Sequence, residues 1–276
     1  MPRTTGTKDH LMTLVTDHPG GDAGMRYPEL AVSVVCLDQT RLGQHIETLH
    51  GLGVARLHVD LVDPAFGGGL GLPLEAISDL RDSCDLPIDV HIMLTRPEPA
   101  VREAAARGAT SVCVHQRSLT AEVGAALRDV GDDGTSVALA VDPGEPISVP
   151  AVRSIRPRRL TIMSVVPGGA GRPFRPEALE TVCEASRLRA AGLVEEVEVD
   201  GAVGPATAPR MAVAGADLLV LGSTVFPLRS PHLNRLPELH RALAGSATSH
   251  SDKENHGCSH DPHRRPAASS SGRTRQ

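Results

Sequence analysis

The 276-residue sequence predicts an α/β fold, a single-domain (β/α)8 (TIM) barrel. Strand-like and helix-like runs alternate along the chain, and eight of the runs are strand-like. The apolar side chains are nearly all branched aliphatics or Ala, with three Phe, one Tyr and no Trp, which suits a parallel sheet covered by helices. A doubly wound open sheet is the rival architecture, but no glycine-rich dinucleotide fingerprint follows the first strand.

The predicted strands are short runs rich in Val, Ile and Leu. They cover Leu30–Cys36, Ala55–Leu61, Pro87–Met93, Ser111–His115, Ser136–Val141, Leu160–Val165, Glu196–Asp200 and Leu218–Leu221. The segments between them contain apolar residues at helical spacing. These predicted helices include Arg41–Leu49, Leu74–Leu80, Glu98–Ala106, Ala121–Val130, Pro176–Ala191, Ala206–Ala214 and Leu233–Leu243.

The two ends of the chain differ in composition from the segment between them. Gly, Thr, Asp and Pro interrupt any periodicity in residues 1–28, and residues 245–276 are polar and rich in Ser. Such segments bury too little apolar surface to offset their ordering entropy. We therefore expect a disordered leader over 1–28, a barrel domain over 29–244 and a disordered tail over 245–276.

Composition also limits the partners. The 28 Lys and Arg against 33 Asp and Glu provide no basic field for nucleic acid or anionic lipid, and no apolar run is long enough to cross a bilayer. Five scattered cysteines without a CxxC pair or a signal peptide favour a cytoplasmic protein. A small substrate is the expected partner, and a homo-oligomer stays open because one sequence shows no interface.

Four metal-capable side chains close three of the predicted strands. His58 and Asp60 end one strand, His91 ends the next, and Asp200 ends the seventh. The carboxyl ends of the strands of a parallel barrel meet at one face, and residues two apart on a strand point to the same side. Two imidazoles and two carboxylates suit a divalent cation, and Zn, Fe, Mn and Co all accept them. The sequence therefore predicts one divalent-metal site.

This arrangement predicts a proton-transfer chemistry. A cation that binds a substrate carbonyl acidifies the neighbouring C–H group and stabilises the enediolate that forms. Asp60 and Asp200 come from opposite sides of the barrel mouth. One carboxylate can then remove a proton from one face of the carbon while the other returns a proton to the opposite face. Asp60 and Asp200 are the predicted catalytic residues.

A second group of residues is rich in glycine and follows the late strands. Gly168 and Gly171 follow strand six, Gly201 follows strand seven, and Gly222 and Ser223 follow strand eight. Barrels often bind phosphate in these loops, and small residues let backbone N–H groups approach it. Taken singly each glycine could be an ordinary turn former. Together they predict a phosphorylated ligand.

The strand ends and their loops also carry a family resemblance. The motifs are Ser33-Val34-Val35-Cys36-Leu37-Asp38, His58-Val59-Asp60-Leu61-Val62-Asp63, Asp89-Val90-His91-Ile92-Met93, Met163-Ser164-Val165-Val166-Pro167-Gly168, Glu198-Val199-Asp200-Gly201 and Gly222-Ser223. In this order they resemble the ribulose-phosphate 3-epimerase family from about residue 31 to residue 226. That family is a (β/α)8 barrel that interconverts D-ribulose 5-phosphate and D-xylulose 5-phosphate with a divalent metal.

The resemblance implies a role for each matching residue. His58, Asp60, His91 and Asp200 would be metal ligands, with Asp60 and Asp200 also the acid/base pair. The implied substrate contacts are Ser33, His91, Met93, Met163, Gly168, Gly171, Asp200, Gly201, Gly222 and Ser223. Without the resemblance, Met93 and Met163 are more simply interpreted as core residues.

The sequence departs from the family pattern around the substrate rather than around the metal. Ala65-Phe66-Gly67-Gly68-Gly69 replaces the family's His-Phe-Val-Pro-Asn, and Val166-Pro167-Gly168-Gly169-Ala170-Gly171-Arg172 replaces Asn-Pro-Gly-Phe-Gly-Gly-Gln. Val62 stands for Met, and Ala202 stands for a second Gly. Allulose 6-phosphate epimerisation and a non-catalytic phosphosugar-binding role therefore remain as alternatives.

Overall fold

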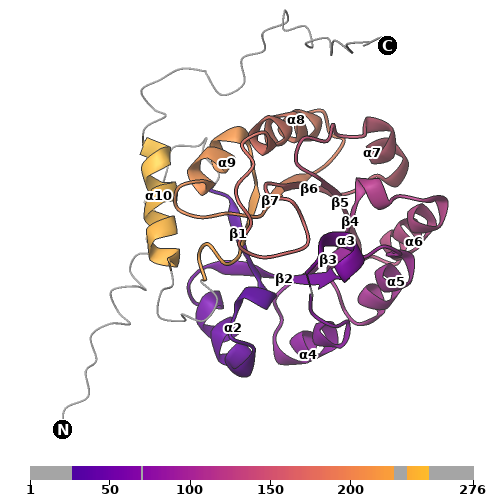
Figure 1. Ribbon diagram of the computed structural model, residues 1–276, viewed down its shortest axis with the longest axis horizontal. Coiled ribbons are helices and arrows are strands. Elements are labelled where there is room, and N and C mark those ends of the chain that lie inside the picture. The colour runs from indigo at the N-terminus through magenta and orange to yellow at the C-terminus, as the bar shows by residue number, and fades with distance from the viewer. Residues whose placement is uncertain (1–26, 70, 227–234, 249–276) are drawn as a thin grey trace, which may run out of the picture.

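The computed structural model describes residues 27–69, 71–226 and 235–248, and it confirms the predicted barrel (Figure 1). Eight parallel strands pair in chain order, and β8 pairs with β1 to close the sheet. They are β1 (Glu29–Ser33), β2 (Val54–Val62), β3 (Ile88–Met93), β4 (Ser111–His115), β5 (Ser136–Val141), β6 (Arg159–Met163), β7 (Glu196–Asp200) and β8 (Leu218–Leu221).

Helices surround the strands in Figure 1. They are α2 (Leu42–His50), α4 (Glu75–Ser83), α5 (Glu98–Ala106), α6 (Ala121–Asp132), α7 (Val149–Ile155), α8 (Ala178–Ala190), α9 (Ala208–Ala214) and α10 (Leu236–Thr248). The short helix α3 (Pro64–Gly67) is different, because it belongs to the loop that follows β2. Asp63 caps it by accepting a hydrogen bond from the Phe66 amide.

Strand alternation divides the side chains between two environments. On β2, Leu57, Val59 and Leu61 belong to the main apolar core, which also includes buried residues of the surrounding helices. His58 and Asp60 alternate with them and point into the barrel. The same alternation on β3 and β7 turns the other metal-capable residues inward. The outward side chains thus form the apolar core, while the inward ones include the candidate ligands.

A buried ion network fills the barrel interior on the amino-terminal side of the candidate ligands. Arg159 on β6 lies 3.0 Å from Asp89 on β3 and 3.5 Å from Glu198 on β7. Thr161 donates a 2.8 Å hydrogen bond to Glu198, and Arg159 donates one of 2.8 Å to Ser111. Desolvation offsets much of the attraction between buried charges, so this network adds less stability than its short distances alone would suggest.

Most predicted elements differ from the observed ones by a few residues at their ends, and three of these differences have a clear local cause or concern the site. β1 ends at Ser33 rather than Cys36, because Val34–Cys36 form a 3-10 turn closed by a Leu37 N–H to Val34 carbonyl bond. Helix α7 was not predicted, since its seven residues are too few for a clear apolar period; Ser148 caps its start. β6 begins one residue earlier than expected and ends at Met163 rather than Val165.

The predicted tail boundary at residue 245 is wrong, because helix α10 runs to Thr248. Residues 1–26 of the expected leader and 249–276 of the expected tail lie outside the described residues, so their disorder stays a prediction. The start of the predicted helix at Leu233 also falls outside them. Glu29 is the first residue of β1, and α10 packs against α9. Within the described ranges, the first strand and the last helix are therefore both part of the barrel domain.

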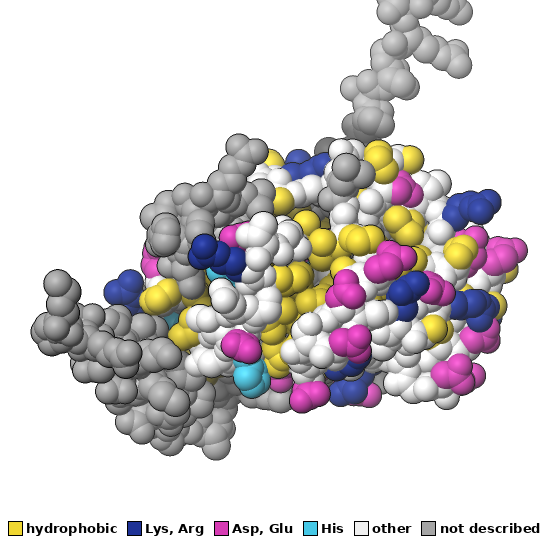
Figure 2. Space-filling model, turned by 90° about the horizontal axis from the view of Figure 1, so that it is seen from below, with side chains coloured by type: hydrophobic (Ala, Val, Ile, Leu, Met, Phe, Trp, Pro, Cys, Tyr) yellow, Lys and Arg dark blue, Asp and Glu magenta, His cyan; other side chains and the backbone are white. Residues whose placement is uncertain are grey.

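Acidic and basic side chains are intermixed on the face that Figure 2 shows. The formal net charge of the chain is −5. Among the described residues, no helix has the length and apolar character needed to cross a bilayer. The cytoplasmic location stays a prediction.

Candidate active site

The four predicted metal ligands meet at the carboxyl ends of β2, β3 and β7. His58, Asp60, His91 and Asp200 each offer one nitrogen or oxygen atom, and these atoms all lie within 4.8 Å of one another. The barrel register explains part of this convergence, because Asp60 on β2 pairs with His91 on β3. The prediction that residues distant in sequence come together in space is therefore confirmed.

Each imidazole faces both carboxylates. Nε2 of His58 lies 3.4 Å from Oδ1 of Asp60 and 3.7 Å from Oδ2 of Asp200. Nδ1 of His91 lies 3.7 Å and 3.3 Å from the same two oxygens. Ligands about 2.1 Å from a shared zinc ion would be roughly 3.4 Å apart in a tetrahedral arrangement. These separations fit a four-ligand divalent centre better than direct hydrogen bonds.

Unpartnered buried atoms give a second test of the fit. Nδ1 and Nε2 of His58 and Nδ1 of His91 are buried and have no hydrogen-bond partner. Buried polar atoms are rarely left unpaired in native proteins, so such atoms call for a partner. A divalent cation would satisfy the two nitrogens that face the carboxylates. The donor set and its geometry both suit such an ion.

The charges of the cluster change the acid–base properties of its members. Burial alone would lower the pKa of His58, but the neighbouring Asp60 and Asp200 carboxylates raise it to about 10. Burial opposes ionisation of Asp60, yet His58 and His91 lower the pKa of this carboxyl. A divalent cation would take the place of the proton that these carboxylates hold on His58.

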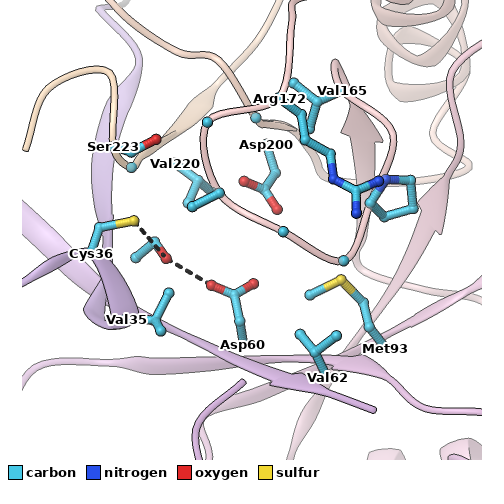
Figure 3. A pocket seen from close by; sticks show the side chains of 18 of the residues that line it. Val35, Cys36, Asp60, Val62, Met93, Val165, Arg172, Asp200, Val220 and Ser223 are labelled. Carbon is cyan, nitrogen blue, oxygen red and sulfur yellow. Dashed lines mark hydrogen bonds between the residues drawn. The ribbon is translucent and has the colours of Figure 1, made fainter. Parts of the chain in front are cut away.

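A cavity of about 260 Å³ opens above this cluster. Asp60 and Asp200 lie on opposite sides of it (Figure 3). Ligand pockets commonly measure roughly 300–1,000 Å³, so this cavity suits a small ligand. Ser33 donates a hydrogen bond to Asp60 and accepts one from the Cys36 thiol, the path that the dashed lines mark in Figure 3. Burial, together with the charges of Asp60 and Asp200, raises the pKa of Cys36 to about 11, so the thiol stays protonated.

The expected phosphate-binding residues line one side of the cavity. Gly168, Gly171, Gly201, Gly222 and Ser223 all border it. Gly201 has a φ of 103°, and a side chain there would place its Cβ 2.4 Å from Val165, so only glycine fits. Ala202 follows it with a φ of 46°, a left-handed conformation that a non-glycine residue adopts at a cost.

Two loops that depart from the family pattern contact each other at the mouth of the cavity. A Cβ on Gly67, in the loop after β2, would lie 2.4 Å from the Cα of Gly168, in the loop after β6. This approach requires glycine at both positions. Arg172 adds a 2.5 Å hydrogen bond from Nη2 to the Gly67 carbonyl. Arg172 also borders the cavity, and it is the only Lys or Arg side chain among the described residues that line it.

The structure assembles nearly all predicted site residues around this cavity. Ser33, Met93 and Met163 line it together with the two aspartates and the glycines. Neither His58 nor His91 lines it, because both side chains are buried. The metal-ligand role expected of His91 agrees with this position, whereas its expected contact with substrate finds no support in it.

Sequence reasoning missed a polar chain behind His91. Nε2 of His91 lies 2.9 Å from Nε2 of His115, and Nδ1 of His115 lies 2.5 Å from Oδ1 of Asp142. Burial lowers the pKa of His115 to about 4 despite its bond to Asp142. His115 ends strand β4, just as His91 lies near the end of β3, so the same strand-end pattern could have identified it.

The fold and the cluster first define a class: a (β/α)8-barrel protein with a candidate divalent-metal centre at the carboxyl end of its strands. Residues 29–226 match the model of the ribulose-phosphate 3 epimerase family. The chain belongs to the ribulose-phosphate 3-epimerase family, an isomerase-class family of epimerases. The family and enzyme-class predictions are thereby confirmed.

Individual relatives agree with this assignment. The chain is 33% identical over 207 residues to ribulose-phosphate 3-epimerase of Mycobacterium tuberculosis, covering 74% of this chain and 88% of that one. The Escherichia coli enzyme of the same name is 29% identical, over 71% and 88%. Among solved structures, 3-hexulose-6-phosphate synthase from Salmonella typhimurium has a TM-score of 0.55 at 15% identity, covering 79% of this chain and 99% of that one. That likeness shows the fold alone.

Proposed function

We propose that this protein is a metal-dependent epimerase that inverts C3 of a ketose phosphate, interconverting D-ribulose 5-phosphate and D-xylulose 5-phosphate. One observation supports it above the others: Asp60 and Asp200 face each other across the cavity and contact the same two imidazoles. A site that only bound a sugar phosphate would not need two opposed carboxylates. The names of the relatives support the choice of substrate.

His58, Asp60, His91 and Asp200 would hold one divalent ion, with Zn, Fe, Mn and Co all suited to this donor set. When bound, such an ion supplies Lewis acidity that stabilises negative charge on a substrate oxygen. Asp60 and Asp200 are the groups that move protons. One carboxylate removes the C3 proton from one face, and the other delivers a proton to the opposite face.

The side chains around the carboxylates have supporting roles in this proposal. Ser33 holds Oδ2 of Asp60 by a 2.7 Å hydrogen bond and thereby orients the carboxylate. Met93 and Met163 present apolar surface to the reacting carbons and exclude water from them. Gly171, Gly201, Gly222 and Ser223 would hold the phosphate through backbone N–H groups, with Arg172 adding a positive charge.

The test is hydrogen exchange at C3 of ribulose 5-phosphate in deuterated water, followed by NMR. The proposal expects deuterium at C3 and the appearance of xylulose 5-phosphate. Both should stop with a chelator and return when a divalent ion is added. Exchange with allulose 6-phosphate alone would move the assignment to that substrate. The absence of exchange with any ketose phosphate in folded, metal-loaded protein would contradict an epimerase.

A further inference from the structure

We propose that Asp142 and His115 fix the tautomer of His91, so that Nδ1 of His91 presents a lone pair toward Asp60 and Asp200. The inference rests on the proposed metal centre, and it adds two positioning residues behind it. Neither residue borders the cavity, so neither would touch the substrate. Their effect would reach the centre only through His91.

The contacts form one continuous chain from the centre outward. Nδ1 of His91 lies 3.3 Å from Asp200, and Nε2 on the other edge of the ring lies 2.9 Å from Nε2 of His115. The opposite nitrogen of His115, Nδ1, lies 2.5 Å from Oδ1 of Asp142. Both imidazoles are fully buried, and Asp142 is 9% exposed. Bulk water therefore does not reach either ring.

These contacts allow only one arrangement of hydrogens if both imidazole rings are neutral. An ionised Asp142 can only accept, so Nδ1 of His115 must carry the hydrogen and donate it. Nε2 of His115 is then an acceptor, and Nε2 of His91 must donate to it. The remaining nitrogen of His91, Nδ1, has no hydrogen. A metal-bound imidazole requires such a free lone pair.

Two further side chains keep Asp142 and His115 in place. Nε of Arg117 lies 2.9 Å from Oδ2 of Asp142, so the carboxylate is held at both oxygens. The guanidinium of Arg117 also lies 4.3 Å from the centre of the Phe66 ring, and Phe66 packs edge-on against His115 at 4.9 Å. Phe66 belongs to α3, in the loop that replaces the family's His-Phe-Val-Pro-Asn.

Charge balance favours neutral rings in this chain. Arg117 already compensates the negative charge of Asp142, so the carboxylate needs no imidazolium beside it. A divalent ion on the far side of His91 would repel a positively charged His115. With both rings neutral, Asp142 increases the electron-donating character of His91 without transferring a proton.

The first measurement is long-range ¹H–¹⁵N NMR of protein labelled with ¹⁵N-histidine, which distinguishes the two neutral tautomers from the imidazolium. His91→Gln and His115→Gln assign the two rings among the 13 histidines. The proposal expects the Nδ1–H tautomer for His115 and the Nε2–H tautomer for His91. His115 in the Nε2–H or doubly protonated form would overturn it.

The second measurement is zinc affinity by competition with a chromophoric chelator. Asp142→Leu removes the acceptor, and we expect zinc to bind about 10- to 100-fold more weakly. Asp142→Asn retains a carbonyl oxygen, so a smaller loss is expected. If Asp142→Leu fails to fold, Asp142→Asn must then show weakened zinc binding and mixed His115 tautomers. Asp129→Asn is the matched control, because Asp129 pairs with Arg102 on the exposed surface.

The result separates this inference from the proposed function. Expected tautomers and tight zinc binding, with no deuterium exchange at C3, would contradict the epimerase and leave the role of Asp142 and His115 intact. Wild-type zinc affinity in folded Asp142→Leu would overturn the inference, whether or not the protein epimerises its substrate.

Discussion

The hydroxyl of Ser33 donates a 2.7 Å hydrogen bond to Oδ2 of Asp60, while the other oxygen of Asp60 faces His58 and His91. β1 and β2 are paired at this level, with Ser33 opposite His58. One carboxylate oxygen is thus held in place by a hydroxyl, and the second belongs to the candidate metal centre.

Replacing Ser33 by Ala tests that contact. A hydrogen bond to a charged group contributes about 1.5–3 kcal/mol, so Ser33→Ala should lower kcat about 10- to 100-fold. Steady-state kinetics on ribulose 5-phosphate measures the change. Ser83→Ala is the control, since the exposed Ser83 hydroxyl only donates to a backbone carbonyl within helix α4. A kcat equal to wild type would show that Ser33 does not orient the base.

Asp60→Asn and Asp200→Asn should each lower turnover by at least about 100-fold, because each removes one of the two proton-transfer groups. Circular dichroism should remain unchanged. Zinc content is measured alongside, because both residues are also candidate ligands. A variant that retained zinc and full epimerase activity would contradict the two-base mechanism.

Arg172→Met removes the cation that borders the cavity. If Arg172 contacts the phosphate, KM for the ketose phosphate should rise about tenfold or more, with kcat changed far less. Arg102→Met, which breaks an exposed ion pair with Asp129, provides the control. An unchanged KM would show that Arg172 does not contact the phosphate, and its hydrogen bond to the Gly67 carbonyl would be its remaining role.

Ala202→Gly should stabilise the fold. Ala202 has a φ of 46°, which costs a residue with a Cβ about 1–2 kcal/mol, and the added freedom of glycine in the unfolded chain offsets part of the gain. We expect the free energy of unfolding in urea to rise by about 0.5–1 kcal/mol. Arg156→Gly, at a φ of 52° after α7, should behave similarly. Destabilisation of both variants would contradict the inference that the left-handed backbone is strained at Ala202 and Arg156.

Cys36 should make stability fall at high pH. Burial raises its pKa from 9.0 to about 11 in the folded state, so the unfolded chain loses this proton first. The contribution of this thiol to the free energy of unfolding is therefore complete below pH 9 and is lost as the pH rises through about 11. Urea unfolding across this pH range, compared with Cys36→Ala, measures the contribution.

The same buried thiol should react slowly with an alkylating reagent. Mass spectrometry after iodoacetamide treatment at pH 8 should show slower labelling of Cys36 than of the more exposed Cys84. Equal rates would contradict a protonated, buried thiol.

Strand periodicity made most of the candidate site predictable. A period of two assigns Asp60 and His58 to the same face, and parallel pairing brings His91 and Asp200 to the same end of the barrel. Helix α7 and the end of α10 were harder to predict, because a seven-residue helix and a polar helix end give weak patterns.

The barrel and the four converging side chains could be inferred from the sequence alone, because alternation and parallel pairing fix which residues share the carboxyl end of the sheet. The motifs at the strand ends indicated the family. The support of His91 and the boundary of the cavity became visible only in the folded structure. The contacts of His115 with Asp142 and of Gly67 with Gly168 join separate loops and strands at specific side-chain and backbone conformations. Those conformations depend on packing between distant segments, which no local pattern records.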